Sequence, residues 1–257
     1  MLGAHLSRSS VTADRIASDA EVVQIFVSNP RGYQPPPSGA TDGLVGLGVP
    51  VYVHLPYLVN PASADESVRD RSRALIAATD AACAGVIAGI VIHGGQGGPK
   101  ATVAEASARW VESLTGLDLQ VPLLVENTAG GNAAPGRNLD DLAALVESLR
   151  GIGLPTGVCF DTCHGFAAGY EDLESAYRVL RARLGQVDLV HLNDSRDPLG
   201  SARDRHALID TGTIGLGALA SVASAAVNDS CPVVLETPGT PEIWRNEINL
   251  LRKTINQ

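Results

Sequence analysis

Short runs of apolar and β-branched residues recur along the whole length of this 257-residue chain. Several runs, such as Gly89-Ile90-Val91-Ile92, contain no polar side chain. That pattern is typical of parallel strands that are buried on both faces. We expect eight strands, near residues 2–6, 22–27, 51–54, 86–93, 121–126, 157–161, 189–193 and 233–236.

The stretches between these runs carry apolar residues at helical spacing. Residues 66–84 and 139–149 are clear examples, and the second stretch has Leu142, Leu145, Val146 and Leu149 on one face. Strand and helix therefore alternate eight times, which predicts an α/β protein with the (β/α)₈ TIM-barrel fold. The alternative is an open doubly wound sheet, but no Gly-x-Gly-x-x-Gly motif opens a helix after the first strand. No linker divides the chain, so we expect residues 1–257 to form a single domain.

Side chains that bind metal ions stand at the ends of the predicted strands. The third to eighth strands end in a histidine or an acidic residue, and the loops add more: His54, His93, Glu126, Asp161, His164, His191, Asp204, His206 and Glu236. In a TIM barrel the carboxyl ends of the strands meet at one rim, where the active site lies. A single histidine or acidic residue at a strand end is usually a structural hydrogen-bonding group. The same feature at the ends of six consecutive strands is hard to explain in that way. We expect the set to converge on one site.

The chemistry of this set favours a centre with more than one metal ion. Imidazole and carboxylate ligands without cysteine favour zinc, with manganese or iron as alternatives. A catalytic zinc ion takes about three or four protein ligands and carboxylates can bridge ions, so the set predicts two or three ions.

Net charge gives an ambiguous indication of the partner. A value of -9 argues against nucleic acid. Three divalent ions would bring it to about -3 and concentrate positive charge at the site, so the local field would govern binding. The only lysines are Lys100 and Lys253, and neither ends a strand. A Schiff-base mechanism is therefore disfavoured.

Other features predict a cytoplasmic protein with no membrane partner. No apolar run approaches the roughly 20 residues that a membrane span needs, and the first residues lack the charged and apolar regions of a signal peptide. The four cysteines, Cys83, Cys159, Cys163 and Cys231, make no disulfide framework. We expect them to be reduced and mostly buried.

Longer motifs resemble one protein family. They are Gly3-Ala4-His5-Leu6-Ser7, Val125-Glu126-Asn127-Thr128-Ala129-Gly130, Asp161-Thr162-Cys163-His164, His191-x-Asn193-Asp194-Ser195, Asp204-Arg205-His206 and Leu235-Glu236-Thr237-Pro238. In this order, and almost from end to end, the chain resembles the endonuclease IV family of abasic-site (AP) endonucleases.

This resemblance implies a trinuclear zinc site. The first ion would take His54, His93 and Glu126; the second Glu126, Asp161, His191 and Glu236; and the third His164, Asp204 and His206. His5 matches a family position that is not a ligand. The implied enzyme is a zinc-dependent hydrolase of base excision repair, acting as a monomer, with Glu126, Asp161 and Glu236 as catalytic residues. It would cut duplex DNA 5′ to an abasic site and leave a 3′-hydroxyl and a 5′-deoxyribose phosphate, with 3′-end cleaning as a further activity.

Substrate recognition is predicted from two positions. Arg31 and Tyr57 resemble family positions that enter the DNA stack and help to hold the abasic nucleotide outside the helix. The alternative is that Tyr57 packs on the barrel rim and Arg31 is solvated. The chain departs from the family pattern at residues 210–213 and at the glycine-rich residues 94–98. The latter segment is expected to be either a phosphate cradle or a flexible rim loop.

Two other classes of function compete with this interpretation. A metal-dependent sugar isomerase or epimerase on a similar barrel would use fewer imidazoles and more aromatic walls. The five histidines of the set and an aromatic content of 4% count against it. A catalytically inactive DNA-binding module would have no need of both Glu126 and Glu236.

Overall fold

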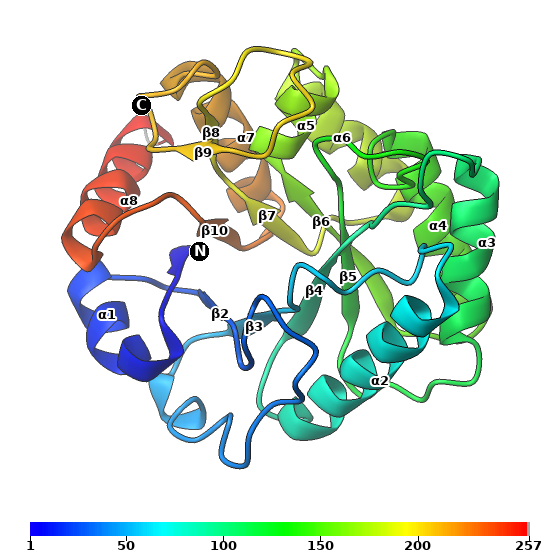
Figure 1. The fold of residues 1–257 in the computed structure, drawn as a ribbon. Coiled ribbons are helices and arrows are strands. Elements are labelled where there is room, and N and C mark those ends of the chain that lie inside the picture. Colours follow the sequence, from blue (N-terminus) through cyan, green and yellow to red (C-terminus); the bar gives the residue numbers. More distant parts are fainter. Residues whose placement is uncertain (256–257) are drawn as a thin grey trace.

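Eight parallel strands close into a barrel in the computed structural model, which describes residues 1–255 (Figure 1). Neighbouring strands follow the chain order, and the last strand pairs with the first to close the barrel. The strands are β1 (Leu2–His5), β2 (Val23–Ile25), β3 (Val51–His54), β4 (Gly89–His93), β5 (Leu123–Glu126), β6 (Thr156–Asp161), β7 (Leu189–His191) and β10 (Val233–Leu235). The predicted TIM barrel is confirmed, and the open sheet is excluded.

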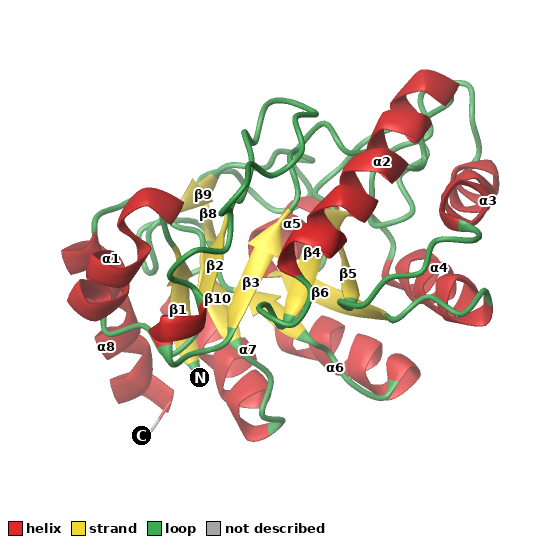
Figure 2. Ribbon diagram, turned by 90° about the horizontal axis from the view of Figure 1, so that it is seen from below, coloured by secondary structure: helices red, strands yellow, loops and turns green. Residues whose placement is uncertain are grey.

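Helices surround the strands, and long loops gather at one end of the barrel (Figure 2). The helices are α1 (Val11–Ser18), α2 (Glu66–Cys83), α3 (Val103–Leu114), α4 (Leu139–Gly151), α5 (Thr162–Ala168), α6 (Leu173–Leu184), α7 (Leu216–Asn228) and α8 (Pro241–Ile255). Their starts are encoded locally. Thr102 and Glu105 form a capping box at α3, and the Asn138 side chain accepts hydrogen bonds from the Asp140 and Asp141 N–H groups in the first turn of α4. These bonds satisfy amide groups that the helix itself leaves unpaired.

The prediction that a helix follows every strand is wrong after β2. Residues 26–50 contain no α-helix, only the 3₁₀ turn η2 (Val45–Leu47). The segment includes Pro30, residues Pro35 to Pro37 and several glycines, and both residue types disfavour helix. Two helices, α5 and α6, instead lie between β6 and β7, and a short antiparallel hairpin of β8 (Asp194–Ser195) and β9 (His206–Ala207) follows β7.

Residues on the barrel strands alternate between the helix-facing core and the barrel interior. Val53, Ile90 and Val125 belong to the large core under the helices. A separate cluster fills the interior: Val22, Tyr52, Val91, Leu124, Cys159, Leu189 and Val234. Gly3 lies beside it, where a Cβ atom would come within 1.7 Å of the Val22 carbonyl oxygen, so only glycine allows this contact between β1 and β2.

Two further expectations concern the whole chain. Among residues 1–255, no helix is long and apolar enough to cross a membrane. All four cysteines are buried, as predicted, and none is paired in a disulfide bond.

Candidate metal centre

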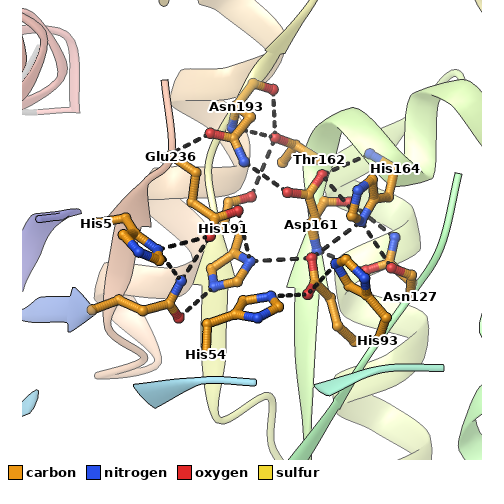
Figure 3. A network of polar contacts seen from close by, with 12 residues as sticks. His5, His54, His93, Asn127, Asp161, Thr162, His164, His191, Asn193 and Glu236 are labelled. Atoms are coloured by element: carbon orange, nitrogen blue, oxygen red, sulfur yellow. Dashed lines mark hydrogen bonds and ion pairs between the residues drawn. The ribbon is translucent and has the colours of Figure 1, made fainter. Parts of the chain in front are cut away.

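A polar layer lies directly above the apolar interior of the barrel. Inward-facing positions recur every two residues along a strand, so the step from Tyr52 leads to His54, and the step from Leu124 leads to Glu126. Applied to all eight strands, this step gives His5, Gln24, His54, His93, Glu126, Asp161, His191 and Glu236. The two-residue period of the strands therefore places one polar side chain per strand at the carboxyl rim (Figure 3).

Glu126 is the centre of this layer and is fully buried. Four imidazole nitrogens surround its carboxylate: Nδ1 of His164 and of His191 at 3.1 Å, Nε2 of His54 at 3.2 Å and Nε2 of His93 at 3.3 Å. Burial opposes the negative charge, but the neighbouring imidazoles, His191 foremost, hold the pKa of Glu126 well below its usual range. The carboxylate is therefore an anion that faces nitrogen donors from several strands at once.

A second group forms where Glu126 meets three residues of β6, β7 and the end of β10. One ligand atom from each of Glu126, Asp161, His191 and Glu236 lies within 4.8 Å of the others. Burial raises the pKa of Asp161. Burial opposes the charge on His191, yet the carboxylates of Glu236 and Glu126 raise its pKa to about 9. A proton on His191 thus partly neutralises this acidic cluster, and a metal cation would do the same.

A third group joins α5 to the loop before β9. Asp204 Oδ2 lies 3.2 Å from His164 Nε2, and Asp204 Oδ1 lies 3.0 Å from His206 Nε2. Nε2 of His206 is buried, and despite its short distance to Asp204 it makes no hydrogen bond of good geometry with any described residue. A buried imidazole nitrogen without a hydrogen bond is unusual, and a metal ion would satisfy it.

Cys163 was not among the predicted ligands, yet it lies near this group. Its sulfur is within 4.8 Å of ligand atoms of Asp204 and His206. Burial raises the pKa of the Cys163 thiol to about 12. The cysteine is therefore a neutral thiol at pH 7 unless a metal ion displaces its proton.

Sequence reasoning missed the amides that hold these groups in place. Asn193 Nδ2 donates to Asp161 Oδ2 at 2.7 Å, and the Asn193 side-chain oxygen accepts from the Glu236 N–H at 2.8 Å. Gln24 is fully buried and contacts His5, His191 and Glu236. One signal was present for Gln24, because it is the only uncharged polar residue in the middle of the predicted strand 22–27.

The layer opens into a pocket of about 460 Å³, lined among others by Phe26, Tyr57, Arg196 and Arg205. Tyr57 is 56% exposed, and its ring stacks on that of His93 with the ring centroids 6.0 Å apart. The Tyr57 N–H donates to the Pro30 carbonyl at 3.1 Å, which brings the loop of the exposed Arg31 alongside. Both predicted recognition residues therefore lie on adjacent loops at the rim.

The glycine-rich segment 94–98 is not a phosphate cradle. Four of its backbone N–H groups already donate to protein oxygens at 3.0–3.1 Å. The pairs are Gly94 with Glu126 O, Gln96 with Asn60 Oδ1, Gly97 with Ala133 O and Gly98 with Asn132 O. Because a nest needs free N–H groups to bind an anion, that alternative is wrong. The segment is tied to its neighbours by these bonds.

Comparisons with known proteins agree with this geometry. Residues 18–254 match the family model described as a xylose isomerase-like TIM barrel. Proteins named "Probable endonuclease 4" are 40% identical over 92% of both chains in Mycobacterium bovis, and 38% identical over 100% of this chain and 99% of the relative in Mycobacterium ulcerans.

Solved structures give the same assignment. Endonuclease IV from Thermus thermophilus superimposes with a TM-score of 0.83 at 30% identity, over 99% of this chain and 98% of that chain. A 3-keto-D-glucoside 4-epimerase from E. coli has a TM-score of 0.71 at 17% identity, over 98% of each chain, and so shares the fold alone. Sequence identity over the full length, together with the polar layer at the barrel rim, shows that the chain belongs to the endonuclease IV family of xylose isomerase-like TIM barrels.

Proposed function

We propose that this protein is an AP endonuclease that hydrolyses the phosphodiester bond 5′ to an abasic site in duplex DNA. The products would be a 3′-hydroxyl and a 5′-deoxyribose phosphate. The observation that carries the proposal is the buried Glu126 carboxylate, which has four imidazole nitrogens within 3.3 Å and shares its surroundings with Asp161 and Glu236. The relatives named endonuclease 4 support the same reaction class.

The donor set fits a centre of three divalent ions, with zinc favoured and manganese or iron as substitutes. His54, His93 and Glu126 form one group of ligand atoms, and Glu126, Asp161, His191 and Glu236 form another. We assign His164, Asp204 and His206 to the third ion, because Asp204 lies within 3.2 Å of both imidazoles and the His206 nitrogen makes no hydrogen bond of good geometry with any described residue. Imidazoles and carboxylates in these numbers are typical of multinuclear hydrolase sites.

Divalent ions, when bound, would activate a water molecule and neutralise phosphate oxygens. The protein residues would orient and insulate that site. The Asn193 side-chain amide donates to one oxygen of Asp161 at 2.7 Å, and the His164 backbone N–H donates to the other at 2.6 Å. This carboxylate therefore has one defined orientation. Burial of Glu126 and Asp161 keeps bulk water from their charges and strengthens their electrostatic interactions.

Recognition of the damaged strand would depend on the rim. More than half of the Tyr57 side chain is exposed above His93, which leaves an aromatic surface free to stack on DNA. Arg31 lies on the adjacent loop, and Arg196 and Arg205 line the pocket, where they would meet phosphates. An abasic nucleotide costs less to push out of the stack than an intact one, which provides selectivity without base readout.

Residues 1–257 would form one catalytic domain that acts as a monomer. Cleaning of blocked 3′ ends would be a second use of the same centre, because the bond broken is again a phosphodiester next to a 3′-oxygen. We expect the protein in the cytoplasm.

The test combines metal analysis with cleavage of a defined duplex. Metal-replete protein is incubated with a duplex that carries one abasic site and with the undamaged duplex, and the product is offered to a DNA polymerase. We expect a single cut whose 3′ end the polymerase extends. Absence of cleavage by metal-replete protein would refute the proposal, and epimerisation of a keto sugar instead would favour the alternative class.

A further inference from the structure

Gln24 on β2 is a buried amide in the polar layer that the proposed reaction has not used. Its side chain has no exposed surface. Its Nε2 atom lies 2.7 Å from Glu236 Oε1 and 3.0 Å from His5 Nδ1, and its Oε1 atom lies 2.8 Å from His191 Nε2. Both donors and one lone pair of this amide are therefore occupied by groups of the site, and Figure 3 labels these three partners.

The chemistry of the partners fixes the orientation of the amide. The ionised Glu236 carboxylate can only accept hydrogen bonds, so the amide nitrogen must face it. The amide oxygen then faces His191, and because this oxygen can only accept, His191 Nε2 must carry a hydrogen. The second amide hydrogen is directed to His5 Nδ1 at 3.0 Å. Because the partners require it, this orientation holds whichever way the oxygen and nitrogen of the Gln24 amide are placed.

This orientation has a direct consequence for the other ring nitrogen of His191. A metal ion would displace the proton from Nδ1, and because the remaining hydrogen is held on Nε2, Nδ1 would then present its lone pair to the ion. Nδ1 lies 3.1 Å from Glu126 Oε1 and 3.2 Å from Glu236 Oε2. The imidazole nitrogen and the two carboxylate oxygens would together coordinate one cation.

We propose that Gln24 is a positioning residue that fixes the tautomer of His191 and the orientation of Glu236, and so prepares both side chains for one metal ion. The inference rests on the proposed function, since it assigns a partner to ligands of that centre. Gln24 touches no substrate and is not a catalytic residue.

Removal of the amide would loosen both ligands at once. In Gln24→Met, a side chain of similar length fills the space, but His191 Nε2–H loses its acceptor and Glu236 loses a donor. The Nδ1–H tautomer then competes with the metal-binding one. Loss of such a supporting hydrogen bond weakens metal binding by about 10–100-fold in other metalloproteins, and we expect a change of that size.

The experiment measures zinc affinity of the full chain by competition with a chromophoric chelator, and the imidazole N–H signals of ¹⁵N-histidine-labelled, zinc-loaded protein by NMR. In the wild type we expect a slowly exchanging His191 Nε2–H signal, because this proton is buried and hydrogen-bonded. In Gln24→Met we expect that signal to be lost or to exchange rapidly with water, together with the weaker zinc binding. Gln24→Glu keeps an oxygen for His191 and should keep the signal.

The control is Ile25→Val on the same strand, which packs in the helix-facing core. It should lower the melting temperature and leave both readouts unchanged. Wild-type zinc affinity and a wild-type Nε2–H signal in Gln24→Met would overturn the inference while the proposed function stands. A wild-type protein that binds no zinc would refute the proposed function and this inference with it. If Gln24→Met does not fold, loss of the His191 signal in Gln24→Glu would still overturn the inference.

Discussion

Replacement of Glu126 by glutamine gives the sharpest test of the proposed centre. The change keeps the shape of the side chain and removes one negative charge from a fully buried position. At the 3.1 Å that separates Glu126 from His191 Nδ1, a unit charge contributes about 5 kcal/mol at an effective dielectric constant of about 20. The amide dipole retains part of this interaction, so we expect a loss of about 4 kcal/mol in transition-state stabilisation, which is about 10³-fold in rate.

The assay follows cleavage of a duplex with one abasic site under saturating conditions, alongside metal content and DNA affinity. Turnover should fall by about 10³-fold and metal content should decrease, whereas DNA binding should change far less because Tyr57, Arg196 and Arg205 at the rim are retained. Asp80→Asn is the matched control. Asp80 is also a buried carboxylate, but it lies on α2, outside the polar layer, and accepts the N–H groups of Gln120 and Val121 at 2.9 Å and 2.8 Å.

Asp80→Asn should lower stability and leave the turnover of the folded protein intact. Turnover of Glu126→Gln within about tenfold of the wild type, at full metal content, would show that the charge of Glu126 does not hold ions around the reacting phosphate. Its four imidazole neighbours would then not mark the centre of the reaction.

Three further predictions address the centre, the rim and the core. Elemental analysis of metal-replete protein should give about three divalent ions per chain, and chelation should abolish cleavage and lower the melting temperature until zinc is returned; a reproducible value of one ion would contradict the trinuclear assignment. Tyr57→Ala should weaken binding to abasic DNA by about 1–3 kcal/mol with unchanged metal content, and an undiminished preference for abasic over intact duplex would disprove its recognition role. Burial raises the pKa of Glu247 above its usual value of 4.5, so the stability from this group is fully present below pH 4.5 and is lost as the pH rises through the raised pKa. The melting temperature of Glu247→Gln relative to wild type should therefore increase between pH 4 and pH 8.

Substitutions of residues that hold the metal ligands, such as Asn193, require two measurements in addition to activity. Asn193 bonds to the Asp161 side chain and to the Glu236 backbone, so a change there would move both carboxylates together. Activity alone cannot separate a lost ligand from a displaced one. Metal affinity and the imidazole N–H signals make that distinction.

Local sequence determined the barrel and most of the polar layer. Uninterrupted apolar strands such as Gly89-Ile90-Val91-Ile92 require burial on both faces, and the two-residue strand period then fixes which side chains face inward. Each predicted strand that ended in a histidine or carboxylate therefore delivered that group to the rim. The absence of an α-helix after β2 was also encoded locally, because residues 26–50 are rich in proline and glycine.

Only the tertiary structure decided which of these groups meet and what holds them. Glu126 and His54 are 72 residues apart in the chain, and barrel closure brings them to 3.2 Å. The partners of Gln24 lie on β1, on β7 and at the end of β10, so no local pattern predicts that its amide orients His191. Residues 94–98 could have been an anion site by composition, but β5 and neighbouring loops accept hydrogen bonds from four of their N–H groups. Periodicity determines the direction of a side chain from a few residues, whereas its contacts depend on strands that come together only when the barrel closes.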